Sequence, residues 1–481
     1  MDIKHFVVLL GILVLIPIAT FAAAFSYKIR NWFLFVMIAG SPIIYNLQGT
    51  FFGRIWYRGT ARGYEISLMD ILGFALLVAT LLRPKKGQGP RFFWPAGLAP
   101  LALYFFYCLV SSIFSEPNLF GWWEVFKIFK GMLIILSIAL YIRSEKELNF
   151  LIMGLAFAVC HQCLWSLKLR YVDHVHRVVG TMDHPNSLSM YLCLAAPVLY
   201  AAILSDLPAW TRRVCLAAVG LSMIGVIMTI SRTGNVAWLI VMLGVTVACV
   251  SPRITLKKVL IAMIALICVV GVVSYSWKTL VGRFGETSIE EENDPNNLGR
   301  GSYIRLAKLI IAEHFFGVGL NNWSWYVTNE YQEKDNPKIV YKPYLNTEVE
   351  PDMIPAYGNE TAQAAPAHNL GALTIGELGW VGFVLFAFVW IRWFDLGQSF
   401  LWKRSPEAMH RVGTGIFFGT GAVFLQSMTE WEFRQPPIFY TVSILLGTLA
   451  ALHRIRRKNK KVAAKRARAE SVHPLVTEAG A

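Results

Sequence analysis

Charge is scarce in this sequence. Only 16% of its 481 residues are Asp, Glu, Lys or Arg, whereas 55% are hydrophobic and 14% are aromatic. Apolar runs long enough to cross a bilayer recur along almost the whole chain, for example at Phe6–Phe25 and Val259–Trp277. These runs lack the short alternating pattern of a transmembrane barrel. The sequence therefore predicts an all-α polytopic membrane protein.

The polar loops contain no cysteine. All seven cysteines lie in apolar runs: Cys108, Cys160, Cys163, Cys193, Cys215, Cys249 and Cys268. Their placement indicates neither a disulfide framework nor a zinc site. Cys160 and Cys163 have helical spacing, and we interpret them as small core residues. The first apolar stretch lacks a convincing small-residue cleavage site, so we interpret it as a retained span.

Acidic residues are few beside basic ones, since 30 Asp and Glu stand against 45 Lys and Arg, a formal charge of +15. Much of the excess lies in the tail that begins at Arg454. A basic tail after a last membrane helix is typical of a cytoplasmic topology signal, and we expect no nucleic-acid binding. We therefore divide the chain into a transmembrane domain (1–453), a long loop inserted within it (278–367) and a basic cytoplasmic tail expected to be disordered (454–481).

The basic tail also predicts how the chain threads the membrane. With the tail inside, the loops rich in Lys and Arg fall inside as well, in agreement with the positive-inside rule. The segments left outside are residues 115–123, 170–186, 231–235, 278–367 and 429–437. If Asn31–Asn46 crosses, there are about 13 spans and Met1 lies outside; if it is re-entrant, there are about 12 and Met1 lies inside. Because that segment is short and contains Pro42, we favour about 12 spans.

One outer segment is far longer than an ordinary connection. Residues 278–367 are rich in Asn, Pro, Glu and Asp, yet they contain an apolar-periodic stretch in which Tyr303, Leu306 and Ile310 share a helical face. Loops of this size are often lids or binding surfaces, and we favour that reading over a flexible spacer. No internal repeat is visible, which argues against an inverted-repeat transporter.

Cations gather on the predicted outer side of the membrane. Arg177, Arg232, Arg300 and His368 all fall in short or irregular stretches beside apolar runs, and Arg305 follows on the loop helix. Arginine presents a planar, permanently charged fork suited to phosphate oxygens. A single arginine at a membrane edge is often only a snorkelling side chain. Several on one face predict a site for an anionic, lipid-borne substrate.

His368 stands where the long loop re-enters the membrane, and a histidine there can act as an acid or base near neutral pH. It can equally be a plain interfacial residue. Glu377, nine residues on, faces nearly the opposite side of the helix and lies about 13 Å deeper, so we expect a helix-to-helix hydrogen-bond partner and not a catalytic mate. Lys127 and Lys130 either extend the cationic surface inward or snorkel, and the sequence does not separate these readings.

Five short motifs carry a resemblance to a known family. They are GTMDHPN (Gly180–Asn186), SRTG (Ser231–Gly234), GR before the loop helix (Gly299–Arg300), GVGLNN (Gly317–Asn322) and HNLGALTIGELGWVG (His368–Gly382). In their order and in their hydropathy context, they resemble the O-antigen ligase and O-antigen polymerase superfamily of bacterial membrane glycosyltransferases. The likeness covers nearly the whole chain and implies a GT-C-like helical fold.

The resemblance implies a glycan donor on undecaprenyl diphosphate, used at the periplasmic face of the bacterial inner membrane without nucleotide sugar, metal or other cofactor. It implies that Arg232 and Arg300 hold the diphosphate, with Arg177 as a third cation, and that His368 activates an acceptor hydroxyl on a glycan, lipid or protein. Direct displacement would invert the anomeric carbon. The segment from Glu330 to Pro366 is longer and more acidic than is typical of the family, which leaves the acceptor open.

A second function, from a different class, is a transporter or flippase for an anionic lipid-linked glycan. Such a carrier needs the same cationic surface but no base. His368 separates the two hypotheses, because an enzyme requires it and a carrier should tolerate its loss.

The predicted topology has a direct test. A cysteine introduced at Asn336 should react with an impermeant thiol reagent in intact spheroplasts, whereas a cysteine at Lys403 should react only after the membrane is permeabilised. The opposite labelling would place His368 and the three arginines at the cytoplasmic face.

Overall fold

The computed structural model of the chain describes residues 3–54, 56–85, 92–251, 255–256, 263, 299–331, 364–401 and 405–472. The predicted span Val259–Trp277 and much of the long loop, including Asn336, lie outside these residues, as does Lys403. The described part is almost entirely helical, which confirms the predicted fold class. Its strands are β1 (Gln48–Phe51) and β2 (Tyr64–Ser67), which pair as an antiparallel hairpin.

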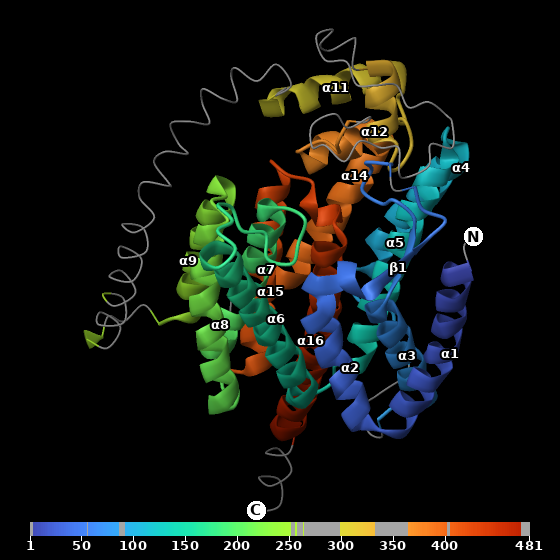
Figure 1. The fold of residues 1–481 in the computed structure, drawn as a ribbon. Helices are drawn as coiled ribbons and strands as arrows, with labels where there is room; N and C mark the ends of the chain where they lie inside the picture. Colours follow the sequence, from blue (N-terminus) through green and yellow to red (C-terminus); the bar gives the residue numbers. More distant parts are fainter. Residues whose placement is uncertain are drawn as a thin grey trace, which may run out of the picture.

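Twelve described helices form an upright bundle (Figure 1). They are α1 (Ile3–Phe25), α2 (Tyr27–Gly40), α3 (Leu68–Leu82), α4 (Leu98–Phe114), α5 (Asn118–Tyr141), α6 (Glu145–Tyr171), α7 (Pro185–Ile203), α8 (Ala209–Met228), α9 (Arg232–Cys249), α14 (Leu370–Gln398), α15 (Ala408–Ser427) and α16 (Pro436–Val472). Helices α11 (Gly299–Glu313) and α12 (Trp323–Tyr326) lie over one end, which we call the loop end. The short helical turns are η1 (Ser41–Leu47), η2 (Val327–Tyr331) and η4 (Glu432–Arg434).

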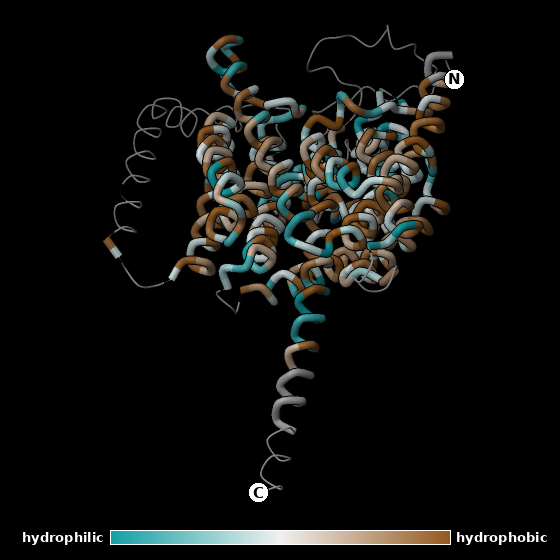
Figure 2. The backbone as a smooth tube through the Cα atoms, turned by 90° about the horizontal axis from the view of Figure 1, so that it is seen from below, coloured by the Kyte–Doolittle hydropathy of each residue, from teal (hydrophilic) through white to brown (hydrophobic). Residues whose placement is uncertain are grey.

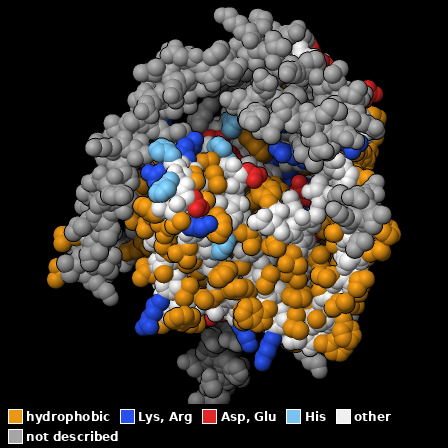
Figure 3. Space-filling view, viewed as in Figure 1, with side chains coloured by type: hydrophobic (Ala, Val, Ile, Leu, Met, Phe, Trp, Pro, Cys, Tyr) orange, Lys and Arg blue, Asp and Glu red, His pale blue; other side chains and the backbone are white. Residues whose placement is uncertain are grey.

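Seven of the described helices are long and apolar enough to cross a membrane: α1, α6, α7, α8, α9, α14 and α16. Helices α3 and α4 are apolar but shorter. Seen along the bundle, most helical turns are hydrophobic (Figure 2). On the face shown in Figure 3, hydrophobic side chains cover the middle, whereas the visible Lys, Arg, Asp, Glu and His side chains gather towards the two ends. This distribution matches a polytopic membrane protein.

Helix α7 lies at the centre of the bundle and packs against α8, α9 and α15. Small residues on α15 allow this close approach. A Cβ at Gly419 would come within 2.3 Å of the Leu194 carbonyl oxygen, and one at Gly415 within 2.6 Å of the Val198 Cα. Membrane helices commonly pack through such small residues. The N-terminus of α7 is therefore held at a fixed place at the loop end, where the candidate site lies.

Helices α1 and α2 meet at the end of the bundle opposite the loop end. At their junction, Arg30 donates to the backbone oxygen of Arg83, 2.8 Å away at the end of α3. Lys85, just beyond α3, is paired with Glu147 at the start of α6. Helix α2 has 14 residues, and η1 follows it with a kink at Ile43. Neither is among the described helices that are long and apolar enough to cross a membrane, so the choice between about 12 and about 13 spans stays a prediction.

The basic tail also differs from expectation. Helix α16 does not end near residue 453 but continues to Val472, so residues 454–472 are helical where we expected disorder. Ala, Lys, Arg and Glu predominate in this stretch, and they are among the best helix formers. A continuous helix leaving the membrane needs no tertiary partner to persist for a few turns when its propensity is this high.

Candidate functional site

His368 is fixed at the point where the long loop joins α14. The next residue, Asn369, caps that helix: its side-chain oxygen accepts from the Ala372 N–H at 2.8 Å, while its amide donates to the Met428 carbonyl oxygen at 2.9 Å. An Asn cap of this kind satisfies a free N–H of the first turn. The capping residue thereby ties the start of α14 to the end of α15, and His368 is held between them.

Glu430 is the partner of His368. The His368 Nδ1 lies 2.7 Å from Glu430 Oε2, and the other Glu430 oxygen accepts from the Asn186 side-chain amide, also at 2.7 Å. The Glu430 side chain is 5% exposed, whereas that of His368 is 34% exposed. When Nδ1–H donates to the carboxylate, Nε2 of a neutral imidazole carries the lone pair. The arrangement can therefore orient His368 as a base whose reactive nitrogen remains accessible.

A second histidine, His184 at the N-cap of α7, contacts the same turn between α15 and α16. His184 Nδ1 is 3.7 Å from Glu432 Oε1 and accepts from the backbone N–H of Asn186 at 3.2 Å, which caps α7. Ligand atoms of His368, Glu430 and Glu432 all lie within 4.8 Å of one another. Among the described residues, this is the group that could hold a metal ion. The hydrogen bond between His368 and Glu430 is complete without one, and we assign no metal.

Helix α11 covers His368. The Tyr303 and His368 rings lie 5.8 Å apart between centroids. Leu306 and Ile310, on the same face of α11, are buried in a cluster with Leu373 and other residues of α14 and the preceding loop. The expected helix and its apolar face are thus confirmed. Helix α11 lies over the start of α14, and burial of its apolar face in this cluster holds it there.

Two of the predicted arginines lie at the loop end, near the turn between α8 and α9. The backbone N–H of Val178 donates to the Met228 oxygen at 3.4 Å, and Arg177 Nε donates to the Thr229 oxygen at 3.5 Å. These contacts hold Arg177, from the segment before α7, against the turn between α8 and α9. Arg232 is exposed just after that turn, at the first residue of α9. Helix α9 begins against α7, because Gly234 packs on Ser189. Both arginines therefore belong to the same end of the bundle as Asn186 and its partner Glu430.

The structure describes the two arginines of α11, Arg300 and Arg305, less completely. Arg300 is the second residue of α11, three residues before Tyr303, and its side chain lies outside the described residues. Arg305 is exposed on the same helix. Since Tyr303 contacts His368, the backbone of α11 at Arg300 is about one helical turn from that contact. The structure thus brings this segment to His368 but does not define the guanidinium of Arg300.

Lys127 and Lys130 neither snorkel nor face an open surface. Lys127 is paired with Glu124 at 2.6 Å and donates to the backbone oxygens of Arg434 and Thr60. Lys130 is paired with Asp70 at 3.1 Å and donates to the backbone oxygen of Glu65. Burial raises the pKa of the Glu65 carboxyl, and the two lysines oppose that rise. Both lysines therefore satisfy buried acceptors within the fold.

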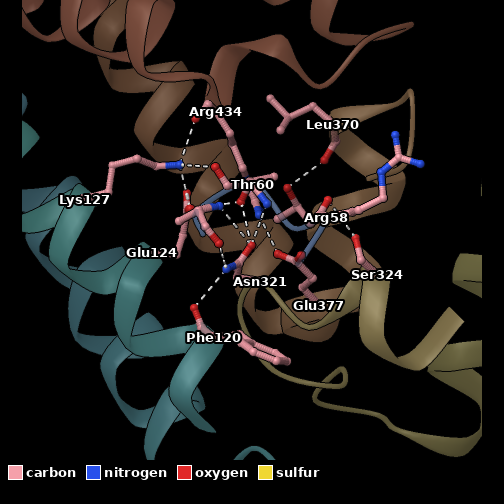
Figure 4. A network of polar contacts seen from close by, with 12 residues as sticks. Arg58, Thr60, Phe120, Glu124, Lys127, Asn321, Ser324, Leu370, Glu377 and Arg434 are labelled. Carbon is pink, nitrogen blue, oxygen red and sulfur yellow. Dashed lines mark hydrogen bonds and ion pairs between the residues drawn. The ribbon is translucent and has the colours of Figure 1, made fainter. Parts of the chain in front are cut away.

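Glu377 has a structural partner, as the sequence predicted. Its carboxylate lies 2.5 Å from Arg434 Nη1, and both side chains are at least 95% buried. Around this ion pair lies a polar network centred on Asn321 (Figure 4). The Asn321 side chain accepts from the Thr60 N–H at 2.7 Å and donates to the Phe120 oxygen at 2.9 Å. The network joins four parts of the chain to the GVGLNN motif: the loop between β1 and β2, α5, α14 and the turn before α16.

The glycines of that motif are required by close backbone contact. Gly317 has φ +80° and lies so near α14 that a Cβ would come within 2.4 Å of the Glu377 carbonyl carbon. Gly319 donates its N–H to the Glu377 backbone oxygen at 2.8 Å. Only glycine allows both the positive φ and this approach. The motif therefore serves to seat the loop after α11 on α14.

Sequence reasoning missed Glu430 and Asn186. Both were visible in segments assigned to the outer side, Asn186 in GTMDHPN and Glu430 in TEWEFRQPP. The available signal was a pair of acidic residues, Glu430 and Glu432, in an outer turn only nine residues long. Nothing in the linear order connects that turn to His368, which lies 62 residues earlier in the chain.

In comparison with known proteins, residues 217–387 match the family model described as O-antigen ligase. The matched region includes Arg232, Arg300, the GVGLNN motif, His368 and Glu377. No curated protein matches the chain.

The ion pair between Glu377 and Arg434 has a testable energetic role. Removing one partner leaves a buried charge uncompensated, which costs about 3–5 kcal/mol. Arg434→Leu should therefore lower the melting temperature of the detergent-solubilised protein strongly. Adding Glu377→Gln should recover part of the loss, because it removes the stranded charge. Arg392→Leu, which breaks the exposed pair with Asp395, should change the melting temperature little. Equal losses in Arg434→Leu and Arg392→Leu would contradict the assigned role.

Proposed function

The chain carries an O-antigen ligase domain and belongs to the O-antigen ligase and polymerase superfamily, and from this membership we propose its reaction. The protein is a glycosyltransferase of the bacterial inner membrane. It moves a glycan from undecaprenyl diphosphate to an acceptor hydroxyl at the periplasmic face. The acceptor is a glycan, a lipid or a protein in the assembly of a surface polysaccharide or O-glycan.

One observation carries the proposal: the chain of contacts from Asn186 through Glu430 to His368. Glu430 is almost fully buried and accepts from both neighbours at 2.7 Å. A buried carboxylate that holds Nδ1–H fixes the imidazole tautomer and stabilises the imidazolium that forms on proton transfer. A plain interfacial histidine would not need such an orienting partner. This geometry supports the enzyme over the carrier.

The proposed step is a direct displacement. His368 Nε2 takes the proton of the acceptor hydroxyl as the oxygen attacks the anomeric carbon of the donor sugar. The bond between that carbon and the diphosphate oxygen breaks, and its electron pair leaves with undecaprenyl diphosphate. One glycosidic bond is made, one glycosyl phosphate bond is lost, and the anomeric carbon is inverted. The proton resides on His368, paired with Glu430, until it passes to solvent.

The leaving diphosphate needs positive charge. Arg177 contacts the turn that precedes Arg232 at the loop end, and we assign both, with Arg300, to the diphosphate oxygens. Arg305, exposed on α11, is a supporting cation. Arginine supplies bidentate hydrogen bonds and a permanent charge, and fixed charges act more strongly in a partly dehydrated site. Metal-independent chemistry is part of this proposal. Lys127, Lys130 and Glu377 have no substrate role in it.

The role of His368 is tested with purified protein, the lipid-linked donor and an acceptor. Loss of a general base costs about 10²–10⁴-fold in rate, so His368→Ala should nearly abolish transfer while donor binding largely survives. Glu430→Gln should lower the rate less, because the base remains but loses its orienting charge. His176→Ala, at an exposed histidine of the loop before α7, is the matched control.

Two outcomes would reject this assignment. Transfer at the wild-type rate in His368→Ala would mean that the histidine is not the base. Movement of lipid-linked glycan across a liposome membrane by the intact protein, with no transfer to any acceptor, would replace the enzyme with the transporter or flippase.

The assignment of arginines to the diphosphate predicts a different pattern of effects on donor binding and transfer. Arg232→Lys keeps the charge but loses the planar fork, and a charge-assisted hydrogen bond is worth about 1.5–3 kcal/mol. Donor binding and transfer should therefore fall together by about 10- to 100-fold, and Arg300→Ala should behave similarly. Arg212→Lys, at an exposed arginine at the other end of α8, should leave both unchanged. Unimpaired donor binding in Arg232→Lys would reduce that arginine to an interfacial anchor.

A further inference from the structure

A cavity of about 700 Å³ lies beside the turn that carries Glu430. It is formed by three parts of the chain: the end of η1 with the β1–β2 hairpin and its loop, the segment before α7, and the turn before α16. Its lining residues are Tyr45, Gln48, Thr50, Phe51, Phe52, Gly53, Arg54, Gly59, Thr60, Arg62, Glu65, Asp183, Trp431, Gln435 and Pro436. The volume falls within the range of sites that bind small ligands.

The lining is polar, aromatic and balanced in charge. Arg54 and Arg62 supply two positive charges, and Glu65 and Asp183 supply two negative ones. A diphosphate in this cavity would be repelled by the two carboxylates as well as attracted by the two arginines, so the lining would favour its binding little. A sugar suits the cavity better, because its hydroxyls both donate to carboxylates and accept from guanidinium groups. The aromatic ring of Trp431 offers an apolar surface for the C–H face of a sugar ring.

One buried group in the wall lacks a hydrogen-bond partner. Gln435 is 5% exposed, and its side-chain oxygen makes no hydrogen bond within the structure. Leaving a buried acceptor unsatisfied costs about 1–3 kcal/mol. That oxygen has almost no accessible surface, so it faces the packed wall of the cavity and not its open volume. The polar, aromatic and charge-balanced lining as a whole, to which Gln435 belongs, therefore indicates the ligand.

The cavity adjoins the proposed base through the chain itself. Trp431 directly follows Glu430, the partner of His368, and Asp183 lies three residues before Asn186 on the other arm of the same contact chain. The arginines assigned to the diphosphate lie elsewhere, on the turn between α8 and α9 and on α11. His368, Glu430 and Asn186 thus form a contact chain whose sequence neighbours, Trp431 and Asp183, line the cavity.

We propose that this cavity is a saccharide subsite that binds the acceptor glycan, with Trp431 and Gln435 as two of its recognition residues. This assignment rests on the proposed function, because it gives the base an acceptor to deprotonate. It restricts the acceptor class to a saccharide, free or lipid-anchored, whose hydroxyl is presented to His368.

The test measures glycan binding to the full-length His368→Ala protein in detergent, where no turnover occurs. The probes are two free glycans from a strain lacking this protein: the glycan released by mild acid from its lipid-linked pool, and the core oligosaccharide of its lipopolysaccharide. Saturation-transfer NMR and titration should show binding of at least one. That binding should persist when the intact lipid-linked donor is also present at saturation.

Variants then locate the binding. Gln48→Trp places a large ring in the cavity from a strand position that accepts aromatics, and should weaken glycan binding at least about tenfold. Gln435→Leu should weaken it by a few-fold to about tenfold. Val172→Trp, at an exposed position of the loop after α6, is the matched control and should have no effect.

Three outcomes would overturn the proposal: binding of neither glycan, unchanged affinity in Gln48→Trp, or displacement of the glycan by the donor. The last would identify the subsite as one for the donor sugar. Failure of the proposed function is seen separately, as transfer at the wild-type rate in His368→Ala; in that case, binding of each free glycan without donor still tests the cavity, because no transfer can occur without the donor.

Discussion

The buried ion pair between Glu377 and Arg434 is the interaction on which the arrangement at the loop end depends. It fastens the turn between α15 and α16 to α14, and Lys127 secures the same turn by donating to the Arg434 backbone oxygen. That turn also carries Glu430 and lines the cavity with Trp431. A charge pair inside a helical bundle is costly unless it is complete, so the turn has one stable position. Glu430 and Trp431, which lie on that turn, are therefore held in a defined position.

Polar residues in this protein separate into two kinds by their surroundings. Lys127, Lys130 and Glu377 are buried and paired, as a membrane interior requires of any charge it encloses. Arg232 and Arg305 are exposed at the loop end, and His368 is partly exposed. The buried set stabilises the fold, whereas the exposed set is the one to which the proposed reaction assigns the substrate. Residue type alone does not make this distinction.

The proposed reaction follows from the order of these regions. A lipid-linked donor keeps its chain in the bilayer, and its diphosphate would reach the arginines beside α9 and α11. The acceptor glycan would occupy the charge-balanced cavity beside the β1–β2 hairpin. His368 and Glu430 hold the start of α14 against the turn before α16, and α11 covers His368. In the proposed reaction, separate sites of different net charge would bind the donor and the acceptor without competition.

Much of this protein was determined by sequence alone, because the signals are local. Hydropathy predicted the helical membrane fold, helical spacing predicted the buried face of α11 at Leu306 and Ile310, and the rotation per residue predicted that Glu377 serves packing. Tertiary structure decided what depends on distant segments. The pairing of His368 with Glu430 joins residues 62 apart, and the partners of Lys127 and Lys130 come from other elements. The junction of α1 and α2 is held by Arg30 donating to the backbone oxygen of Arg83, 53 residues later in the chain. Such contacts depend on how helices pack, which no single stretch of the chain encodes.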